Sequence, residues 1–327
     1  MTRPGVRRLK RSAARPVPAR PASRGRLAIG YSAAAATVPY LILKVLWVSG
    51  STVGMTNPAT FHDSAYLIAN VLSILADAVA VGVAVALTVA RGRRLSPPLI
   101  LLPAWIATGL LGTVLVLAPV AAPLARTTST GNGDDALRGW VYLLVYGSFS
   151  VQGLLLLTAF VLYSRDRWWS DLRQALTGAK GAPWVPAAIV LAALSVAVGL
   201  LHLTWSFGIR AGLGSLAARQ TGVDRATLAV HGLFAVAAAG GMLLTFRPQR
   251  GPWWLPPTLV WCGTASMVTW GGYTLALGVW QPSLTSPMLA WTTAAKVAFG
   301  LGDAVLIGAL VRRELARREL SISPNSR

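Results

Sequence analysis

The chain has 327 residues, of which 54% are hydrophobic and only 12% are charged, and its mean hydropathy is +0.57. Soluble globular domains carry about 25% charged residues, so this composition excludes an ordinary soluble protein and indicates a surface that mostly faces lipid. The net charge of +20 would favour nucleic-acid binding in a soluble domain. The single cysteine, Cys262, excludes an intrachain disulfide.

A basic, proline-containing tail opens the chain, and residues 1–26 are predicted to be disordered because they cannot bury a core. Eight apolar stretches of 21 to 26 residues follow, each long enough to cross a ~30 Å hydrocarbon layer as a helix. They cover residues 27–50, 65–90, 97–122, 140–163, 185–207, 226–246, 255–279 and 288–311. The predicted fold class is therefore an all-α, polytopic membrane bundle of eight transmembrane helices.

Lysine and arginine fall mainly on one side of these stretches. The two tails and the loops on their side hold 23 of these residues, whereas the opposite loops hold five. The positive-inside rule then places both termini in the cytoplasm and the protein in the cell membrane as a multipass protein. We expect the basic N-terminal tail to contact anionic lipid, and we expect no nucleic-acid partner.

An internal repeat is predicted from residues that recur at shifts of 158 to 161 positions. The matching residues are Lys44, Trp47 and Gly50 with His202, Trp205 and Gly208; Arg91 and Pro97 with Arg250 and Pro256; and Asn70 with His231. We expect a first four-helix repeat over 27–163, a charged cytoplasmic linker with amphipathic character over 164–183, a second repeat over 184–311, and a cytoplasmic tail over 312–327. Four helices per repeat make the two copies parallel, and a central site would lie between them.

Two lysines and two aspartates lie inside the apolar stretches, where each would cost about 2.5 to 3.5 kcal/mol if it met lipid. Lys44 and Lys296 lie near enough to the outer boundary for their side chains to reach the headgroups. Asp77 and Asp303 lie near mid-span on short side chains and must face protein or water. We expect each aspartate to pair with a lysine on another helix, with Lys44 and Asp77 the nearest pair in sequence.

Neutral polar residues add to this set. Tyr66, Asn70, Ser73 and Asp77 share one face of the second helix. His202 and His231 lie just below the outer boundary, either as ordinary interhelical hydrogen-bonding groups or as part of a cation-rich outer cavity. The predicted intramembrane polar site is Lys44, Asn70, Asp77, Gln152, His202, His231, Lys296 and Asp303. Two histidines without a nearby acid make a poor metal site, so no metal and no cofactor are expected.

One short stretch carries a family resemblance. Trp291 to Gly300, read as WTTAAKVAFG, resembles the last helix of microbial rhodopsins, and Trp270 and Tyr273 are similar to that family's W-x-x-Y. The resemblance implies that Lys296 would hold retinal as a Schiff base, although Thr292 stands where the family has a carboxylate. The chain as a whole looks more like uncharacterised multipass membrane proteins of actinobacteria, a resemblance that implies no activity.

No phosphate-binding loop, H-E-x-x-H zinc helix or G-x-S-x-G nucleophile elbow occurs, and we expect no enzymatic activity. The sequence favours a transporter or permease-like protein for a small anionic or amphiphilic solute of unknown identity, proton-coupled through Asp77 or Asp303. The alternative is a non-transporting scaffold, sensor or protective module whose polar residues serve only helix packing. An intramembrane enzyme or a retinal-binding protein is a more remote alternative.

Overall fold

The fold is known from a computed structural model, which describes residues 24–56, 64–89, 92, 94–128, 137–177, 183–247, 251–282 and 285–322. Over these ranges the regular structure consists of helices joined by turns and irregular segments, with an isolated bridge between Met55 and Leu137. The helices are α1 (Arg24–Val48), α2 (Ser64–Thr88), α3 (Pro97–Thr128), α4 (Gly139–Arg167), α5 (Trp169–Thr177), α6 (Val185–Ser206), α7 (Leu216–Arg219), α8 (Gly222–Phe246), α9 (Leu255–Trp280) and α10 (Pro287–Ile322).

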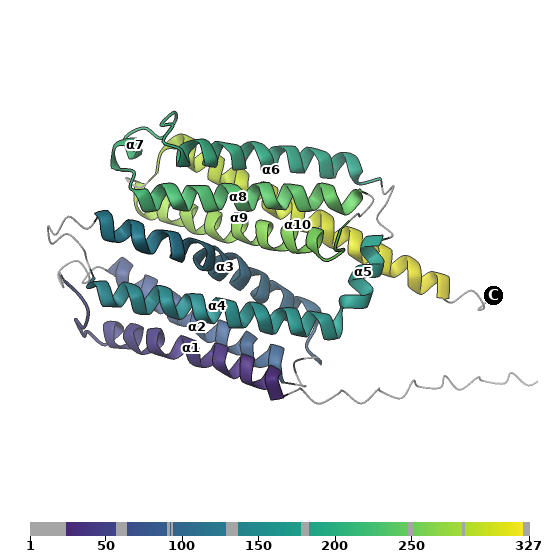
Figure 1. Ribbon diagram of the computed structural model, residues 1–327, viewed down its shortest axis with the longest axis horizontal. Helices are drawn as coiled ribbons and strands as arrows, with labels where there is room; N and C mark the ends of the chain where they lie inside the picture. Colours follow the sequence, from purple (N-terminus) through teal and green to yellow (C-terminus); the bar gives the residue numbers. More distant parts are fainter. Residues whose placement is uncertain are drawn as a thin grey trace, which may run out of the picture.

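Eight long helices run roughly side by side as two groups of four (Figure 1). The first group is α1 to α4, and the second is α6, α8, α9 and α10. The groups meet where α3 packs against α8 and α9, and we call this contact the seam. Helix α1 begins and α10 ends at the same end of the bundle, which we call the basal end; the opposite end is the distal end (Figure 1).

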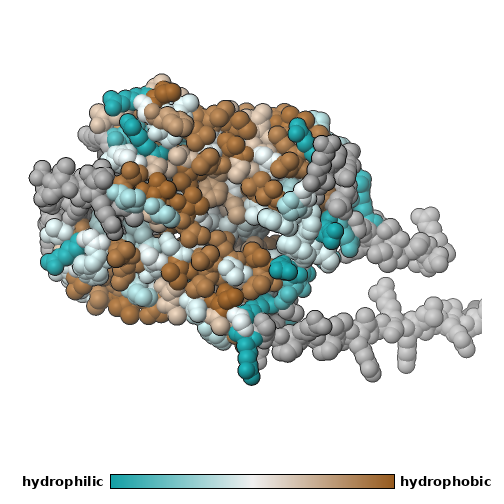
Figure 2. All heavy atoms as spheres, viewed as in Figure 1, coloured by the Kyte–Doolittle hydropathy of each residue, from teal (hydrophilic) through white to brown (hydrophobic). Residues whose placement is uncertain are grey.

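Apolar residues cover the middle of the bundle and hydrophilic residues gather at its two ends (Figure 2). Six helices, α1, α3, α4, α6, α8 and α10, are long and apolar enough to cross a membrane. Large apolar side chains on them stand exposed, such as Leu143 at 73%. Because such a band is stable only in lipid, the chain is a helical membrane protein.

Two of the eight predicted crossings do not reach that standard. In α2, the apolar stretch found among the described side chains is Ser73–Thr88. In α9, tryptophan, threonine and glycine residues interrupt the aliphatic run and lower its hydropathy. Both nevertheless form long helices that run the length of the bundle (Figure 1).

The boundaries of the predicted stretches agree with the helices to within four residues, except at the ends of α3 and α10; the start of α1 also changes the predicted tail. α1 begins at Arg24, so the last three residues of the predicted disordered tail are helical. α10 continues to Ile322, well into the predicted C-terminal tail. α3 continues to Thr128, beyond the predicted end at residue 122. The predicted lipid contact of the N-terminal tail concerns residues 1–23, which lie outside the described residues.

Part of the predicted linker forms α5, and its apolar face packs on protein. Leu176, which is 2% exposed, contacts Leu310 of α10, while Trp169 meets Trp253 edge to face at 4.4 Å. The amphipathic character predicted for this segment is therefore explained by docking against the basal end of the second group.

Candidate functional site

The eight predicted site residues divide between the two four-helix groups, and we call the two sets the first and the second cluster. Lys44, Asn70, Asp77 and Gln152 lie on α1, α2 and α4 of the first group. His202, His231, Lys296 and Asp303 lie on α6, α8 and α10 of the second group. The helix contacts that join the groups involve α3, α8 and α9, so the expected single site between the halves is not what the structure brings together.

In the first cluster, Lys44 is half-buried near the distal end of α1 and donates a hydrogen bond to Asn70 Oδ1 at 2.7 Å. Its ammonium also lies 5.0 Å from the ring centre of Tyr40 and 5.7 Å from that of Trp47, distances at which cation–π attraction operates. The charge of Lys44 is thus already compensated by an amide oxygen and two aromatic faces.

The predicted ion pair between Lys44 and Asp77 is wrong as a direct contact. The two charges interact through space, but Asn70 occupies the position next to the ammonium. Asp77 is 6% exposed, and its Oδ2 has no hydrogen-bond partner among the described residues. The same holds for Gln152 Oε1 on α4. Two other residues of the predicted polar face of α2 add no interhelical contact. Ser73 Oγ donates a hydrogen bond to Asn70 O within the same helix, and the side chain of Tyr66 is not among those described.

The second cluster contains a deeply buried lysine. Lys296 is 2% exposed, and no hydrogen bond or ion pair joins its Nζ to the described residues. Its side chain lies against α9, since a Cβ placed on Gly271 would be 3.3 Å from Lys296 Cε. Both His202 and His231 lie within electrostatic range of Lys296. The expectation that Lys296 reaches the headgroup region is therefore wrong in this conformation.

The two histidines are held differently. His202 Nδ1 lies 2.9 Å from Val198 O, and because a carbonyl only accepts, Nδ1 carries the proton. His231 Nε2 is buried without a partner among the described residues. Aromatic rings flank both: Trp205 at 5.4 Å from His202 and Trp270 at 5.8 Å from His231, between ring centres.

Asp303 lies two helical turns basal to Lys296 on α10 and is fully buried. Its Oδ2 accepts a hydrogen bond of 3.1 Å from Ser195 Oγ on α6, while its Oδ1 has no partner among the described residues. The expected lysine partner is absent from the ion pairs of the described part of the chain. A half-satisfied carboxylate in mid-bundle is costly.

The seam holds polar residues that the sequence analysis did not select. Trp105 Nε1 donates to Thr264 Oγ1, and Trp261 Nε1 donates to Thr108 Oγ1, each at 3.2 Å. Two buried hydroxyls, Thr113 Oγ1 and Ser266 Oγ, lie 2.9 Å apart. The sequence does carry a signal for this contact, because the motif W-x2-T occurs in both α3 and α9, 156 residues apart.

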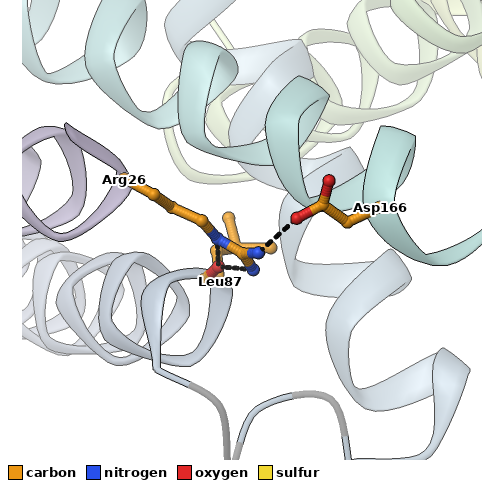
Figure 3. A network of polar contacts seen from close by, with 3 residues as sticks. All are labelled: Arg26, Leu87 and Asp166. Carbon is orange, nitrogen blue, oxygen red and sulfur yellow. Dashed lines mark hydrogen bonds and ion pairs between the residues drawn. The ribbon is translucent and has the colours of Figure 1, made fainter. Parts of the chain in front are cut away.

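A second set missed from sequence lies at the basal end of the first group (Figure 3). Arg26, only 5% exposed, donates from Nε to Leu87 O at 3.0 Å, with a further bond from Nη2, and from Nη1 to Asp166 Oδ2 at 2.8 Å. Its guanidinium also lies 5.3 Å from the ring centre of Tyr163. One arginine thus joins α1, α2 and α4. We call Arg26, Leu87 and Asp166 together the basal clamp.

Within the described ranges, no three His, Cys, Asp or Glu side chains come together as metal ligands would. The comparisons with known proteins add no family: no family model matches the chain, and neither the curated proteins nor the solved structures contain a match. The polar clusters therefore have to be interpreted from their own chemistry.

Proposed function

We propose that the protein crosses the cell membrane eight times as two like-oriented four-helix units with both termini in the cytoplasm. The units are α1 to α4 and α6 with α8 to α10. Support comes from the common end at which α1 begins and α10 ends and from the excess of basic residues at that end. Two further sets of contacts support the repeat.

The turns after α1 and α6 share the same backbone and hydrogen-bond features at positions that lie 158 residues apart in the sequence. Gly50 and Gly208 both have φ +90°, a value that only glycine adopts without strain. The indole of Trp47 donates to Val53 O and that of Trp205 to Ala211 O, each at 2.9 Å. The backbone bond that closes each turn also recurs, from Ser51 to Leu46 O and from Ile209 to Thr204 O.

The seam supplies the second set. The indole of each W-x2-T motif donates to the threonine of the other motif, and both bonds measure 3.2 Å. Reciprocal contacts of this kind, in which i meets j′ and i′ meets j, are characteristic of a two-fold axis. For two units of the same orientation, this axis would run along the membrane normal.

We propose further that the protein is permease-like and moves a small anionic or amphiphilic solute, with proton coupling. The observation that carries this proposal is Asp303, a fully buried carboxylate with one unpartnered oxygen, two turns basal to the buried Lys296 on the same helix. Ionisable groups stacked at two depths inside a membrane bundle are typical of solute and proton pathways. Lys296 would attract the anion, and Asp303 would take up and release the proton.

Asparagine at position 303 is expected to abolish proton coupling while the protein stays folded. The amide oxygen can still accept the bond from Ser195 Oγ, but an amide does not exchange a proton in the physiological range. The measurement uses proteoliposomes loaded with the pH dye pyranine and given inward gradients of lactate, inorganic phosphate or decanesulfonate. We expect at least one anion to acidify wild-type liposomes and to act at least tenfold more slowly on Asp303→Asn.

Asp171→Asn is the matched control, because Asp171 is an exposed acid on α5, away from both clusters; its flux should equal that of the wild type. Asp77→Asn tests whether the first unit contributes. An Asp303→Asn protein with undiminished proton-linked flux would refute the coupling role, and folded wild-type protein inert toward all three probes would count against a permease for these solute classes.

The second candidate function is a non-transporting scaffold or sensor. The specific observation in its favour is that Lys44 with Asn70 and Ser195 with Asp303 join adjacent helices, as packing contacts would. On this hypothesis Asp303→Asn lowers the unfolding temperature and leaves no flux or binding to be lost.

A further inference from the structure

The geometry points to a binding site for a small monoanion inside the second four-helix unit, formed by Lys296, His231 and His202. We call these three residues the Lys-His cluster. This inference deepens the proposed permease function, on which its biological role rests, because it names the ligand class and places the site within one unit rather than at the seam.

The site contains a buried ammonium that has no bonding partner among the described residues. Lys296 is 2% exposed and bonds to none of the described residues. The helices packed against α10 are α5, α6, α8 and α9. The titratable groups that face this region from the membrane-spanning helices are His202, His231 and, two turns away, Asp303, whose Oδ2 is engaged by Ser195. A buried charge that lacks a protein partner calls for a partner from outside.

The cluster also supplies hydrogen-bond donors for an anion. The ammonium of Lys296 offers three N–H groups and no acceptor. His231 Nε2, buried and unpartnered, can present a second donor from another helix. His202 has its Nδ1 proton directed at Val198 O, so its Nε2 carries no proton and cannot donate to an anion. An anion held by Lys296 and His231 would thus satisfy the ammonium and the unpartnered imidazole donor of the cluster.

The net charge of the cluster determines the charge of the ligand that fits it. With Lys296 as an ammonium and both imidazoles neutral, the cluster carries a net charge of +1, which a monoanion would neutralise. A dianion would leave one negative charge in apolar surroundings, where the cost of an unpaired charge is high. The ligand class is therefore a compact monoanion such as a small carboxylate, an inorganic monoanion or a phosphodiester headgroup.

The half-buried lysine of the first unit, Lys44, has different surroundings from Lys296. Lys44 stands 158 positions before His202, the shift that relates the turns of the two units. Its ammonium is already bonded to Asn70 Oδ1 at 2.7 Å and faces two aromatic rings. Lys44 therefore has little need of an anion, and it offers a matched control for Lys296.

The test titrates formate, thiocyanate and sulfate into the purified full-length protein, with sodium gluconate holding the ionic strength constant. Tryptophan fluorescence is the readout, because Trp205 and Trp270 lie against the two histidines. We expect saturable binding of formate and thiocyanate and none of sulfate. Binding should weaken at least tenfold in Lys296→Met and change less than twofold in Lys44→Met.

A second variant guards against misfolding of Lys296→Met. His231→Phe keeps an aromatic ring beside Trp270 but removes the Nε2 donor, and it should also weaken formate binding. Equal losses in Lys44→Met and Lys296→Met, or a folded Lys296→Met protein that binds as the wild type does, would overturn the site. Saturable binding of sulfate as tight as that of formate would overturn the monoanion assignment.

Binding and transport can fail separately. Asp303→Asn should keep formate binding while it loses proton-linked flux, so binding without flux in the wild type would reject only the permease. Flux without binding at the Lys-His cluster would reject only this site. Nanodiscs with and without phosphatidylglycerol identify the source of the anion: loss of the formate response with this lipid means that a headgroup occupies the site, and an unchanged response means a free anion.

Discussion

Gly109→Ala is expected to destabilise the protein by about 2–3 kcal/mol, in the range for overpacked cores, although alanine is the better helix former. A Cβ at this position would lie 2.3 Å from Ala265 O and 2.5 Å from Thr269 Oγ1 on α9. Because the first obstacle is backbone, no side-chain rotation relieves it, and α3 and α9 would have to separate. Separation would also stretch the bonds between Trp105 and Thr264 and between Trp261 and Thr108.

Gly112→Ala is the matched control, because it lies three residues away on α3 and a Cβ there would meet nothing within 4 Å. Without a clash, the higher helix propensity of alanine should leave stability unchanged or raise it by up to about 1 kcal/mol. Unfolding of the detergent-purified proteins by added SDS measures both changes. Equal stability of the two variants would show that the close packing of α3 on α9 does not hold the units together.

Close packing at the seam also follows from the physics of the membrane. Lipid tails are as apolar as leucine, so helices associate there through van der Waals contact and interhelical hydrogen bonds, and small residues let the backbones approach. Gly109, Thr113 and Ala265 supply such small residues at the crossing of α3 and α9. The indole bonds then fix the register of the two helices.

The helices themselves were predictable from sequence, because a segment must be about 20 apolar residues long to cross a bilayer and must satisfy its backbone internally. Leu255 begins α9 as expected, where Pro256 and Pro257 lack the N–H groups that a first helical turn leaves free. The ends that extend further, at Arg24, Thr128 and Ile322, lie where polar or proline residues follow the apolar run. Hydropathy marks the lipid boundary, and a helix can continue beyond it.

The partners of the buried polar groups were much harder to predict. Burial of Lys296, Asp77 and Asp303 follows from the cost of exposing a charge to lipid. Which group each one meets depends on helix rotation and packing, and these are tertiary properties. Asn70 takes the place next to Lys44 that the sequence argument gave to Asp77. Ser195 meets Asp303, but a lone serine in an apolar helix carries no sequence signal.

The location of the polar clusters was wrong for a related reason. A repeat suggests a site between its two copies, but where α3 meets α9 the W-x2-T motifs hydrogen-bond to each other. The intramembrane lysines and aspartates lie on α1, α2 and α10, and each is at least partly buried within its own unit. Matching the W-x2-T motifs in the sequence would have identified the seam helices in advance.

Arg26→Ala is expected to destabilise the first unit by about 2–3 kcal/mol, although the sequence places this arginine in a tail. The guanidinium binds Leu87 O, one of the last carbonyls of α2, which has no partner within its own helix. Removing it leaves a buried acceptor unsatisfied, at about 1–3 kcal/mol, and a gap beside Tyr163. Loss of the pair with Asp166 adds little, because that carboxylate is 50% exposed.

Arg24→Ala is the control for the basal clamp, since Arg24 lies in the same turn of α1 but is exposed. Its unfolding midpoint in SDS should match that of the wild type, whereas the midpoint of Arg26→Ala should fall. Asp166→Asn separates the two contributions: a small loss means that the bonds to Leu87 O carry most of the stability. If Asp166→Asn costs as much as Arg26→Ala, the ion pair rather than the capping of α2 holds α1, α2 and α4 together, and the effect of Asp166→Asn should then weaken as salt is added.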